Sequence, residues 1–266
     1  MPELAEVRLT AEYVDRLAEG KIFNGVWKNP VHKGKGFEIE HPFTIKAESR
    51  GKEMILLLDS IQKYELQQHK ASILKMTMGM SGHFRWSEVG SRPKHTHLSF
   101  LSNEGEMCFV DVRRFGRWSF ESWNPDRGPD PTQDFEGFRS HIMSNLGCKA
   151  FEKPIHEVLI NQKFFNGIGN YLRAEILFRI DCDPFLPAKQ VITQYPEILD
   201  LCRDLPNIAY SLGGGRIKDW KNPDGKVPSN WDEFMLCYGN KSMSKITDSN
   251  NRTFWFNSKW NLKTEL

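Results

Sequence analysis

The first residues of the chain have the chemistry of an amine nucleophile with acid–base partners. Pro2 follows the initiator methionine, and a small second residue normally allows that methionine to be removed, which leaves a terminal proline. A terminal amine has a pKa of about 8 against about 10.4 for lysine, so far more of it is free base near pH 7. Proline is more basic than an average terminal amine, so burial has to assist. Its adduct with an aldehyde carbon is a cationic iminium, an electron sink beside Glu3 and Glu6. The structural alternative is a helix start, where proline and glutamate are both favoured.

Two turns present side chains suited to nucleic acid. Residues 111–118 (DVRRFGRW) place three arginines and two aromatic rings at a strand–turn–strand junction, and residues 78–84 (MGMSGHF) present Met80 between glycines. Arginines pair with phosphates, and a phenylalanine at a turn wedges between stacked bases. Together these side chains suit the hole left by a base rotated out of a duplex. The alternative is two ordinary hairpins with a solvated charged face.

Three weaker candidates lie elsewhere. Residues 166–170 (NGIGN) precede a predicted helix, which suits either a phosphate contact or a turn that needs glycine for its backbone angles. Lys52 is a cation at a strand edge, and Arg252 lies at the tip of a predicted hairpin. None of these three is specific alone.

The elements that position these residues follow from hydrophobic periodicity. Residues 3–19 read as a helix, and polar turns then separate short β-rich runs, which predict an antiparallel sandwich or barrel. The expected strands are 21–28, 44–48, 54–58, 73–78, 97–101, 107–112 and 117–120. After a proline-rich stretch at 123–132 the period becomes helical. The expected later elements are helices at 135–145, 154–161, 170–179 and 193–212, a mobile glycine loop at 213–215, and a hairpin from 245–247 and 253–256.

Composition narrows the class of protein. The chain has 266 residues and a net charge of +2, which neither shows nor excludes a nucleic-acid partner. No apolar run approaches the length of a membrane-spanning helix, and the acidic start is unlike a signal peptide. Five cysteines without a C-x-x-C pair disfavour a zinc ribbon and a disulfide framework. His95 and His97 would share a strand face as half a metal site, but no carboxylate is spaced beside them.

These pieces, in this order, resemble the formamidopyrimidine-DNA glycosylase/endonuclease VIII family of base-excision repair enzymes, in particular its animal branch whose terminal finger lacks zinc. The resemblance spans nearly the whole chain. It is carried by 1–7 (MPELAEV), 50–53 (RGKE), 79–82 (GMSG), 111–118 (DVRRFGRW), 161–177 (NQKFFNGIGNYLRAEIL) and 252–256 (RTFWF). Two positions depart from the family: Ala5 stands where proline or glycine is common, and Leu236 stands where a basic lesion-reading residue is expected.

The resemblance implies a role for each candidate. Pro2 would attack the sugar C1′, Glu3 would protonate the ring oxygen, Glu6 would position the amine and the sugar, and Lys52 would act near the lesion as a charge or proton donor. The implied DNA-contacting residues are Met80, Arg113, Arg114, Phe115, Asn170 and Arg252. Of these, Met80, Arg113 and Phe115 would fill the void after flipping, and Asn170 and Arg252 would hold phosphates.

The implied fold is α+β and multidomain. It consists of an N-terminal helix with an antiparallel β-sandwich (1–122), a linker (123–133), a helix–two-turn–helix domain (134–240) and a zincless β-hairpin finger with its tail (241–266). The implied activity is a bifunctional glycosylase and abasic-site lyase that removes oxidised bases through a proline Schiff base, with no metal and no cofactor.

The expected partner is double-stranded or bubble DNA with damaged bases or abasic sites. A monomer, no membrane contact and a nuclear location are also expected, the location being cytoplasmic if the source is prokaryotic. Two other functions remain open: a DNA-damage binding module without chemistry, and a ribosomal-type helix–two-turn–helix scaffold, against which the β-rich first half argues.

Overall fold

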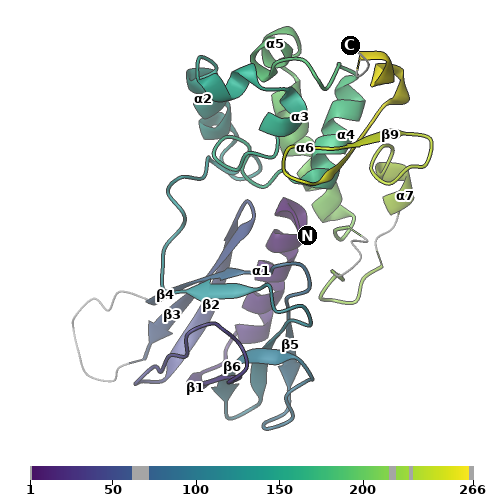
Figure 1. Cartoon of the computed structure of the whole chain (residues 1–266). Coiled ribbons are helices and arrows are strands. Elements are labelled where there is room, and N and C mark those ends of the chain that lie inside the picture. Colours follow the sequence, from purple (N-terminus) through teal and green to yellow (C-terminus); the bar gives the residue numbers. More distant parts are fainter. Residues whose placement is uncertain (1, 62–71, 216–219, 228–229, 264–266) are drawn as a thin grey trace. The chain divides into compact units, whose positions relative to one another are not determined.

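The computed structural model describes residues 2–61, 72–215, 220–227 and 230–263, and this part of the chain forms two compact units (Figure 1). The first unit comprises Met1–Pro2, Glu6–Asn124 and Gly213–Val227, and the second comprises Glu3–Ala5, Pro125–Leu212 and Pro228–Leu266. The domain and linker boundaries expected from the sequence remain a prediction.

The first unit is an antiparallel sheet with a helix packed on its core. Helix α1 (Leu4–Ala18) buries Val7, Ala11 and Val14, which are spaced at three and four residues and so share one face. The sheet order is β5-β7-β6-β1-β2-β3-β4-β8. Its strands are β1 (Phe23–Lys28), β2 (Phe43–Arg50), β3 (Glu53–Ser60), β4 (Ser72–Thr77), β5 (His83–Ser87), β6 (Thr96–Ser102), β7 (Glu106–Val110) and β8 (Arg117–Ser119).

The sheet folds over on itself, which confirms the predicted sandwich. Strands β1 and β2 pair at only one position, Phe23 with Phe43, so the two halves of the sheet separate there. Phe109 of β7 and Trp118 of β8 lie near opposite ends of the strand order, yet their rings are in edge contact with centroids 6.3 Å apart. The aromatic core therefore lies between the two halves.

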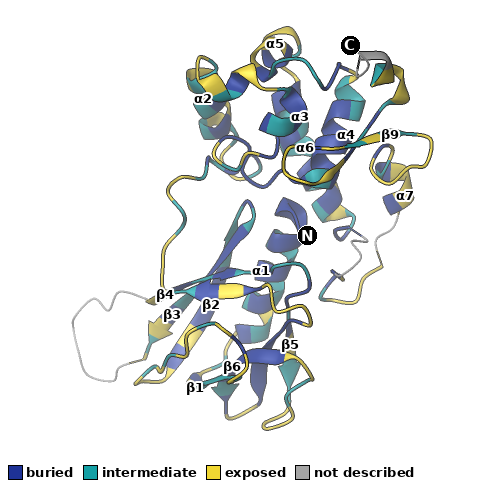
Figure 2. Ribbon diagram, viewed as in Figure 1, coloured by how far each residue is buried: buried dark blue, intermediate teal, exposed yellow. Residues whose placement is uncertain are grey.

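The second unit is helical and ends in a β-hairpin. Its helices are α2 (Phe135–Asn145), α3 (Ile155–Val158), α4 (Asn170–Ile180), α5 (Ala188–Gln194), α6 (Ile198–Ser211) and α7 (Trp231–Phe234), with short 3₁₀ helices η1 (Lys149–Glu152) and η2 (Ser258–Lys263). The hairpin pairs β9 (Ser244–Thr247) with β10 (Thr253–Phe256). Residues 171–177 of α4 are all buried, and Figure 2 colours this helix mostly dark blue.

The structure differs from the predicted elements in several places. The helix expected at 193–212 is two helices, because Pro196 disfavours helical geometry at Tyr195, whose φ is −131°. The helix expected at 154–161 is only the single turn α3. Strand β5 and helix α7 were not expected. His95 has a positive φ of 67° and precedes β6, so it does not share a strand face with His97.

Candidate functional site

The carboxylate of Glu3 is held by the beginning of helix α4. Its Oε2 accepts hydrogen bonds from the backbone N–H groups of Gly169 at 2.8 Å and Leu172 at 3.3 Å, and its Oε1 accepts one from Tyr171 at 3.0 Å. These are the unpaired N–H groups of a helix N-terminus, where the helix dipole attracts an anion. Glu3 is buried, and these hydrogen bonds fix the orientation of its carboxylate. Glu3 is the residue after Pro2 in the sequence.

The glycines before α4 allow this close approach. Gly167 has a φ of +96°, and a Cβ at this position would lie 2.5 Å from the Leu4 side chain. The Leu4 N–H donates to the Gly167 carbonyl at 3.2 Å, which ties the start of α1 to the same turn. The NGIGN segment is therefore a turn that requires glycine, as one of the two sequence interpretations proposed. The N–H groups that follow it bind the Glu3 carboxylate, and the phosphate contact stays a prediction.

Glu6 is held separately, within the first unit. Its side chain is buried and its Oε1 accepts the N–H of Gly215 at 2.8 Å. The three glycines of 213–215, expected as a mobile loop, are buried, and the Gly213 carbonyl accepts a hydrogen bond from the Asn222 amide at 2.8 Å. This segment therefore positions the Glu6 carboxylate.

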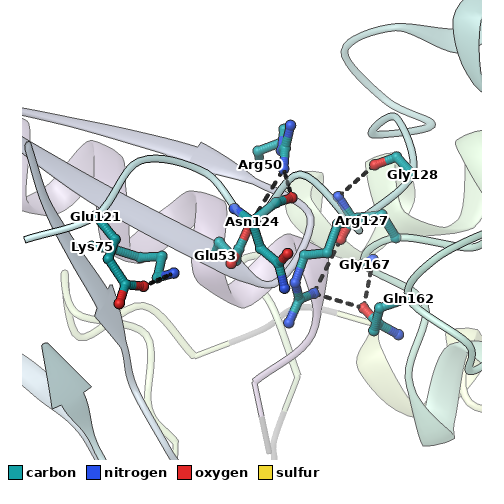
Figure 3. Close-up of polar contacts among 10 residues, drawn as sticks. Arg50, Glu53, Lys75, Glu121, Asn124, Arg127, Gly128, Gln162 and Gly167 are labelled. Carbon is teal, nitrogen blue, oxygen red and sulfur yellow. Dashed lines mark hydrogen bonds and ion pairs between the residues drawn. The ribbon is translucent and has the colours of Figure 1, made fainter. Parts of the chain in front are cut away.

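Lys52 lies in the tight turn between β2 and β3, next to Gly51, whose φ is +58°. Arg50 and Glu53 on either side of the turn are fixed by the same residue, Asn124 (Figure 3). Arg50 donates to the Asn124 carbonyl at 2.8 Å, and Glu53 accepts the Asn124 N–H at 3.3 Å. The guanidinium of Arg50 also lies 3.6 Å from the Glu53 carboxylate. Contacts on both strands therefore hold the base of this turn, which fixes the backbone position of the half-buried Lys52.

In the second unit, a hydrogen bond to Gln162 holds Arg127, which lies shortly after the unit boundary between Asn124 and Pro125. Arg127 donates to the side-chain oxygen of Gln162 at 3.2 Å, and the same oxygen accepts the Gly167 N–H at 3.0 Å (Figure 3). Gln162 therefore supports the glycine turn that precedes α4.

The turns of residues 78–84 and 111–118 are bonded to each other through Asp111, which is fully buried. Its Oδ1 accepts the Ser81 hydroxyl, and its Oδ2 accepts the Gly116 N–H at 2.7 Å. The Arg113 N–H contacts the Ser81 hydroxyl at 3.0 Å. A Cβ at Gly79 would lie 2.7 Å from the Gly116 nitrogen, so the two turns also touch through backbone.

This arrangement exposes the predicted void-filling side chains on a fixed base. Phe115 is 51% exposed, and the Arg113 guanidinium lies over its ring at 5.2 Å from the centroid. Arg114 is exposed with a φ of 56°, and Met80 on the other turn is half-buried. These exposed side chains are accessible to a nucleic acid, and their void-filling role remains a prediction.

Asn170 and Arg252 are brought together in the second unit, where the hairpin packs on α4 (Figure 1). The Asn170 amide donates to the Thr253 carbonyl at 2.8 Å, and its oxygen accepts from Arg173. Arg173 also forms a fully buried ion pair with Asp248 at 2.7 Å. Burial lowers the pKa of Arg173, and the hydrogen bond that Arg173 donates to Asp248 opposes this shift. Burial raises the pKa of Asp248, but the Arg173 hydrogen bond and backbone N–H groups outweigh it and leave that pKa below its usual value.

A groove of about 350 Å³ runs beside Arg252. One wall is the hairpin turn, and the other wall comes from η1, α3 and the residues after α3. The groove is lined by a second cation, the exposed Lys153, by the carboxylate residue Glu157 and by the amides of Asn161 and Gln162. The Gln162 amide nitrogen already donates to the Ile160 and Ile168 carbonyls. Cations contact phosphates, so Lys153 is a candidate that the sequence analysis missed.

Two further buried residues were missed, Arg173 and Asp248. No local signal in the sequence identifies them, because Arg173 and Glu175 are both charged within residues 171–177 and the burial of that segment is seen only in the structure. In the described residues no group of three or more histidine, cysteine, aspartate or glutamate side chains is placed to bind a metal ion. None of the helices described is long and apolar enough to cross a membrane.

The sequence-predicted residues divide between the units. Pro2, Glu6, Lys52, Met80 and the arginine turn belong to the first, and Glu3, Asn170 and Arg252 belong to the second. Pro2 is buried, and Met1 lies outside the described residues.

Comparison with known proteins gives a consistent result. Residues 1–118 match the family model described as the formamidopyrimidine-DNA glycosylase N-terminal domain, and residues 229–260 match one described as endonuclease VIII-like 1, DNA bind. The chain is 35% identical over 285 residues to Endonuclease 8-like 1 of Homo sapiens, covering 96% of this chain and 72% of that protein.

Solved structures agree on the fold. A crystal structure of the MutM (Fpg) protein from Thermus thermophilus superposes with a TM-score of 0.79 at 22% identity, covering 97% of this chain and 98% of that chain. A complex of Lactococcus lactis Fpg with DNA containing an oxidised pyrimidine superposes with a TM-score of 0.74 at 23% identity, covering 96% and 98%. These two likenesses confirm the predicted fold class.

Proposed function

This chain belongs to the formamidopyrimidine-DNA glycosylase/endonuclease VIII family, and we propose that it is a bifunctional DNA glycosylase and abasic-site lyase of base-excision repair. Its substrates are oxidised pyrimidines and formamidopyrimidines in DNA. The observation that carries the proposal is the fixed Glu3 carboxylate. Three backbone N–H groups at the beginning of α4 hold it, and Glu3 follows Pro2 directly in the sequence.

The chemistry requires Pro2 to be the terminal residue, so removal of Met1 is part of the proposal. The proline nitrogen forms a bond to C1′ with its lone pair, and the glycosidic C1′–N bond breaks with its electrons leaving on the base. The departing base takes up the proton that the proline nitrogen loses, so the nitrogen is again neutral before the sugar opens. Glu3 delivers a proton to the ring oxygen O4′, which opens the sugar and leaves a C1′ iminium. Glu6 positions the amine and the sugar.

The iminium then drives strand cleavage. Its positive charge acidifies the C2′ proton, and loss of that proton expels the 3′ phosphate by β-elimination. A second, δ-elimination releases the 5′ phosphate, and water hydrolyses the remaining adduct. Lys52 acts near the lesion as a charge or proton donor from its braced turn. The iminium formed on the chain's own amine is the electron sink for both eliminations.

The remaining candidates hold the DNA. Met80, Arg113 and Phe115 fill the space of the extruded base, with Arg114 as a neighbouring contact, since the two turns present them on one bonded base. Asn170 and Arg252 hold phosphates around the lesion. We also propose a monomer that works in the nucleus, which the similarity to a Homo sapiens relative supports.

The proposal is tested by trapping with borohydride. An abasic duplex and borohydride should give one covalent complex, whose intact mass equals the chain without Met1 plus the cleaved DNA. Pro2→Gly should trap poorly. A matched chain with one extra residue before Pro2 has the same fold elements and a displaced amine, and it should not trap. Equal trapping by that extended chain would contradict the proline mechanism, and tight binding without cleavage would support a binding module.

A further inference from the structure

Arg173 lies at the centre of the contact between helix α4 and the hairpin. Its Nη1 donates to the Asp248 carboxylate at 2.7 Å and to the His156 carbonyl at 3.0 Å, and its Nη2 donates to the Asn170 side-chain oxygen. The guanidinium also lies over the Phe254 ring at 4.6 Å from the centroid. The Arg173 and Asp248 side chains are both 0% exposed.

Asp248 in turn holds the backbone of the hairpin tip. Its Oδ1 accepts the N–H groups of Asn250 at 2.9 Å and Arg252 at 3.0 Å, and its own N–H donates to the Arg252 carbonyl at 2.9 Å. Arg252 therefore starts from a backbone position that two hydrogen bonds fix to Asp248. The aspartate is fixed by Arg173 in the core of the unit.

The same guanidinium decides which way the Asn170 amide faces. A phosphate needs a donor, and only the nitrogen side of an asparagine amide donates. Because the Asn170 oxygen accepts from Arg173, its Nδ2 lies on the opposite side, where one N–H bonds the Thr253 carbonyl at 2.8 Å. The second N–H of that nitrogen is then the group available to a phosphate oxygen.

We propose that Arg173 is a positioning residue for DNA binding, which sets the Asn170 amide directly and the Arg252 backbone through Asp248. The inference rests on the proposed phosphate contacts of Asn170 and Arg252. One buried cation thereby joins the glycine-turn helix and the hairpin into a single phosphate-binding surface.

The first test asks whether Arg173 orients Asn170. In the unaltered chain, Asn170→Ala should weaken binding to abasic-analogue duplex DNA roughly fivefold, as expected for one lost hydrogen bond. Arg173→Lys keeps a cation beside Asp248 but lacks the planar fork that also reaches Asn170. In that background Asn170→Ala should change the dissociation constant by less than about twofold. An equal fivefold loss in both backgrounds would overturn the inference.

The second test asks whether the buried pair positions Arg252. The double variant Arg173→Met with Asp248→Asn removes both charges, so it leaves no unpaired ion in the core. Its salt slope, log K against log salt, should fall by about one unit, the change expected for Arg252→Ala alone. Adding Arg252→Ala to the double variant should then change nothing more. A wild-type slope in the double variant would overturn the inference.

Three controls separate positioning from general damage. Asp181→Asn removes an exposed ion pair to Lys259 in the same unit and should leave affinity and slope unchanged. Circular dichroism should show that each variant is folded. Cleavage of abasic DNA at saturating concentration should remain near wild type in the double variant while the KM rises, because the reacting amine is untouched. Loss of turnover at saturation with an unchanged KM would also count against a positioning role.

The failure of the inference is distinguishable from that of the proposed function. If Asn170→Ala and Arg252→Ala change neither affinity nor slope in the unaltered chain, the phosphate contacts are wrong, and the inference falls with them. If both single effects are present but neither depends on Arg173 and Asp248, only the inference is wrong.

Discussion

Each unit has one aspartate that holds a turn with an exposed arginine: Asp111 in the first unit and Asp248 in the second. The two aspartates have different hydrogen-bond partners. Within the described residues, the hydrogen bonds given to the Asp111 side chain come from neutral groups, the Ser81 hydroxyl and backbone N–H groups, whereas Asp248 pairs with the cation of Arg173. Both residues are buried. The difference matters because removing one partner of a buried ion pair leaves an uncompensated charge, while a neutral donor left unpaired costs only its own desolvation.

The largest expected effect is therefore at Asp248. Asp248→Asn keeps the shape of the side chain but removes the charge that balances Arg173. The free energy of unfolding should fall by about 3–5 kcal/mol. Asp111→Asn should cost about 1–3 kcal/mol, since one amide N–H then faces a donor. Urea denaturation of both variants measures the difference, and Asp181→Asn should lie within about 1 kcal/mol of wild type. Equal losses of unfolding free energy in the two variants would show that the charged and neutral partners make no difference.

The second prediction concerns Phe115, which lies on the turn that Asp111 holds. Phe115→Ala should slow base excision from duplex DNA by about tenfold, because extruding a paired base costs a few kcal/mol that the ring helps to offset. Cleavage of a pre-formed abasic site should change much less. Phe120→Ala is the matched control, since Phe120 is also 51% exposed and its ring contacts Phe37 outside the turn. Equal slowing on both DNA substrates would contradict the void-filling role.

The sequence predicted local elements better than the contacts that join them. Helix 135–145 and the hairpin strands near 245–256 follow from periodicity and turn chemistry over a few residues, and the structure confirms them. The Arg173–Asp248 pair spans 75 residues, and no local pattern announces such a partner. In the sequence, Arg173 has the pattern of an ordinary helix cation, because the burial of residues 171–177 of α4 depends on elements far along the chain.

The candidate site shows the same limit. Pro2, Glu3 and the DVRRFGRW turn were recognised because their chemistry lies in adjacent residues. The anchor of Glu3 is 166 residues away at Gly169, and that of Glu6 is 209 residues away at Gly215. Asp111 was part of the quoted motif, yet its role as the junction of two turns depends on Ser81, which lies 30 residues earlier.

The smallest expected effect is a pH dependence that separates the two regions. Desolvation lowers the pKa of His97, against its hydrogen bond to the Asp111 carbonyl, and desolvation also lowers the pKa of His32 and His83 in the first unit. The second unit has one such residue, His156, also lowered chiefly by burial. As the pH falls through about 6.5, the unfolded chain therefore binds protons that the folded chain does not, and stability decreases.

Asp248 behaves differently because its pKa is below its usual value. Its contribution is complete above about pH 4 and is lost only at lower pH, as the folded carboxylate is protonated. Hydrogen exchange at pH 7.5 and 5.5, corrected for the intrinsic rate, should thus show weaker protection of the Gly116 amide, which bonds Asp111, at the lower pH. The Arg252 amide, which bonds Asp248, should lose less. His97→Gln should reduce the change at Gly116, because its amide replaces a ring that resists protonation. Equal loss of protection at both amides would show that low pH weakens the Asp111 and Asp248 turns to the same extent.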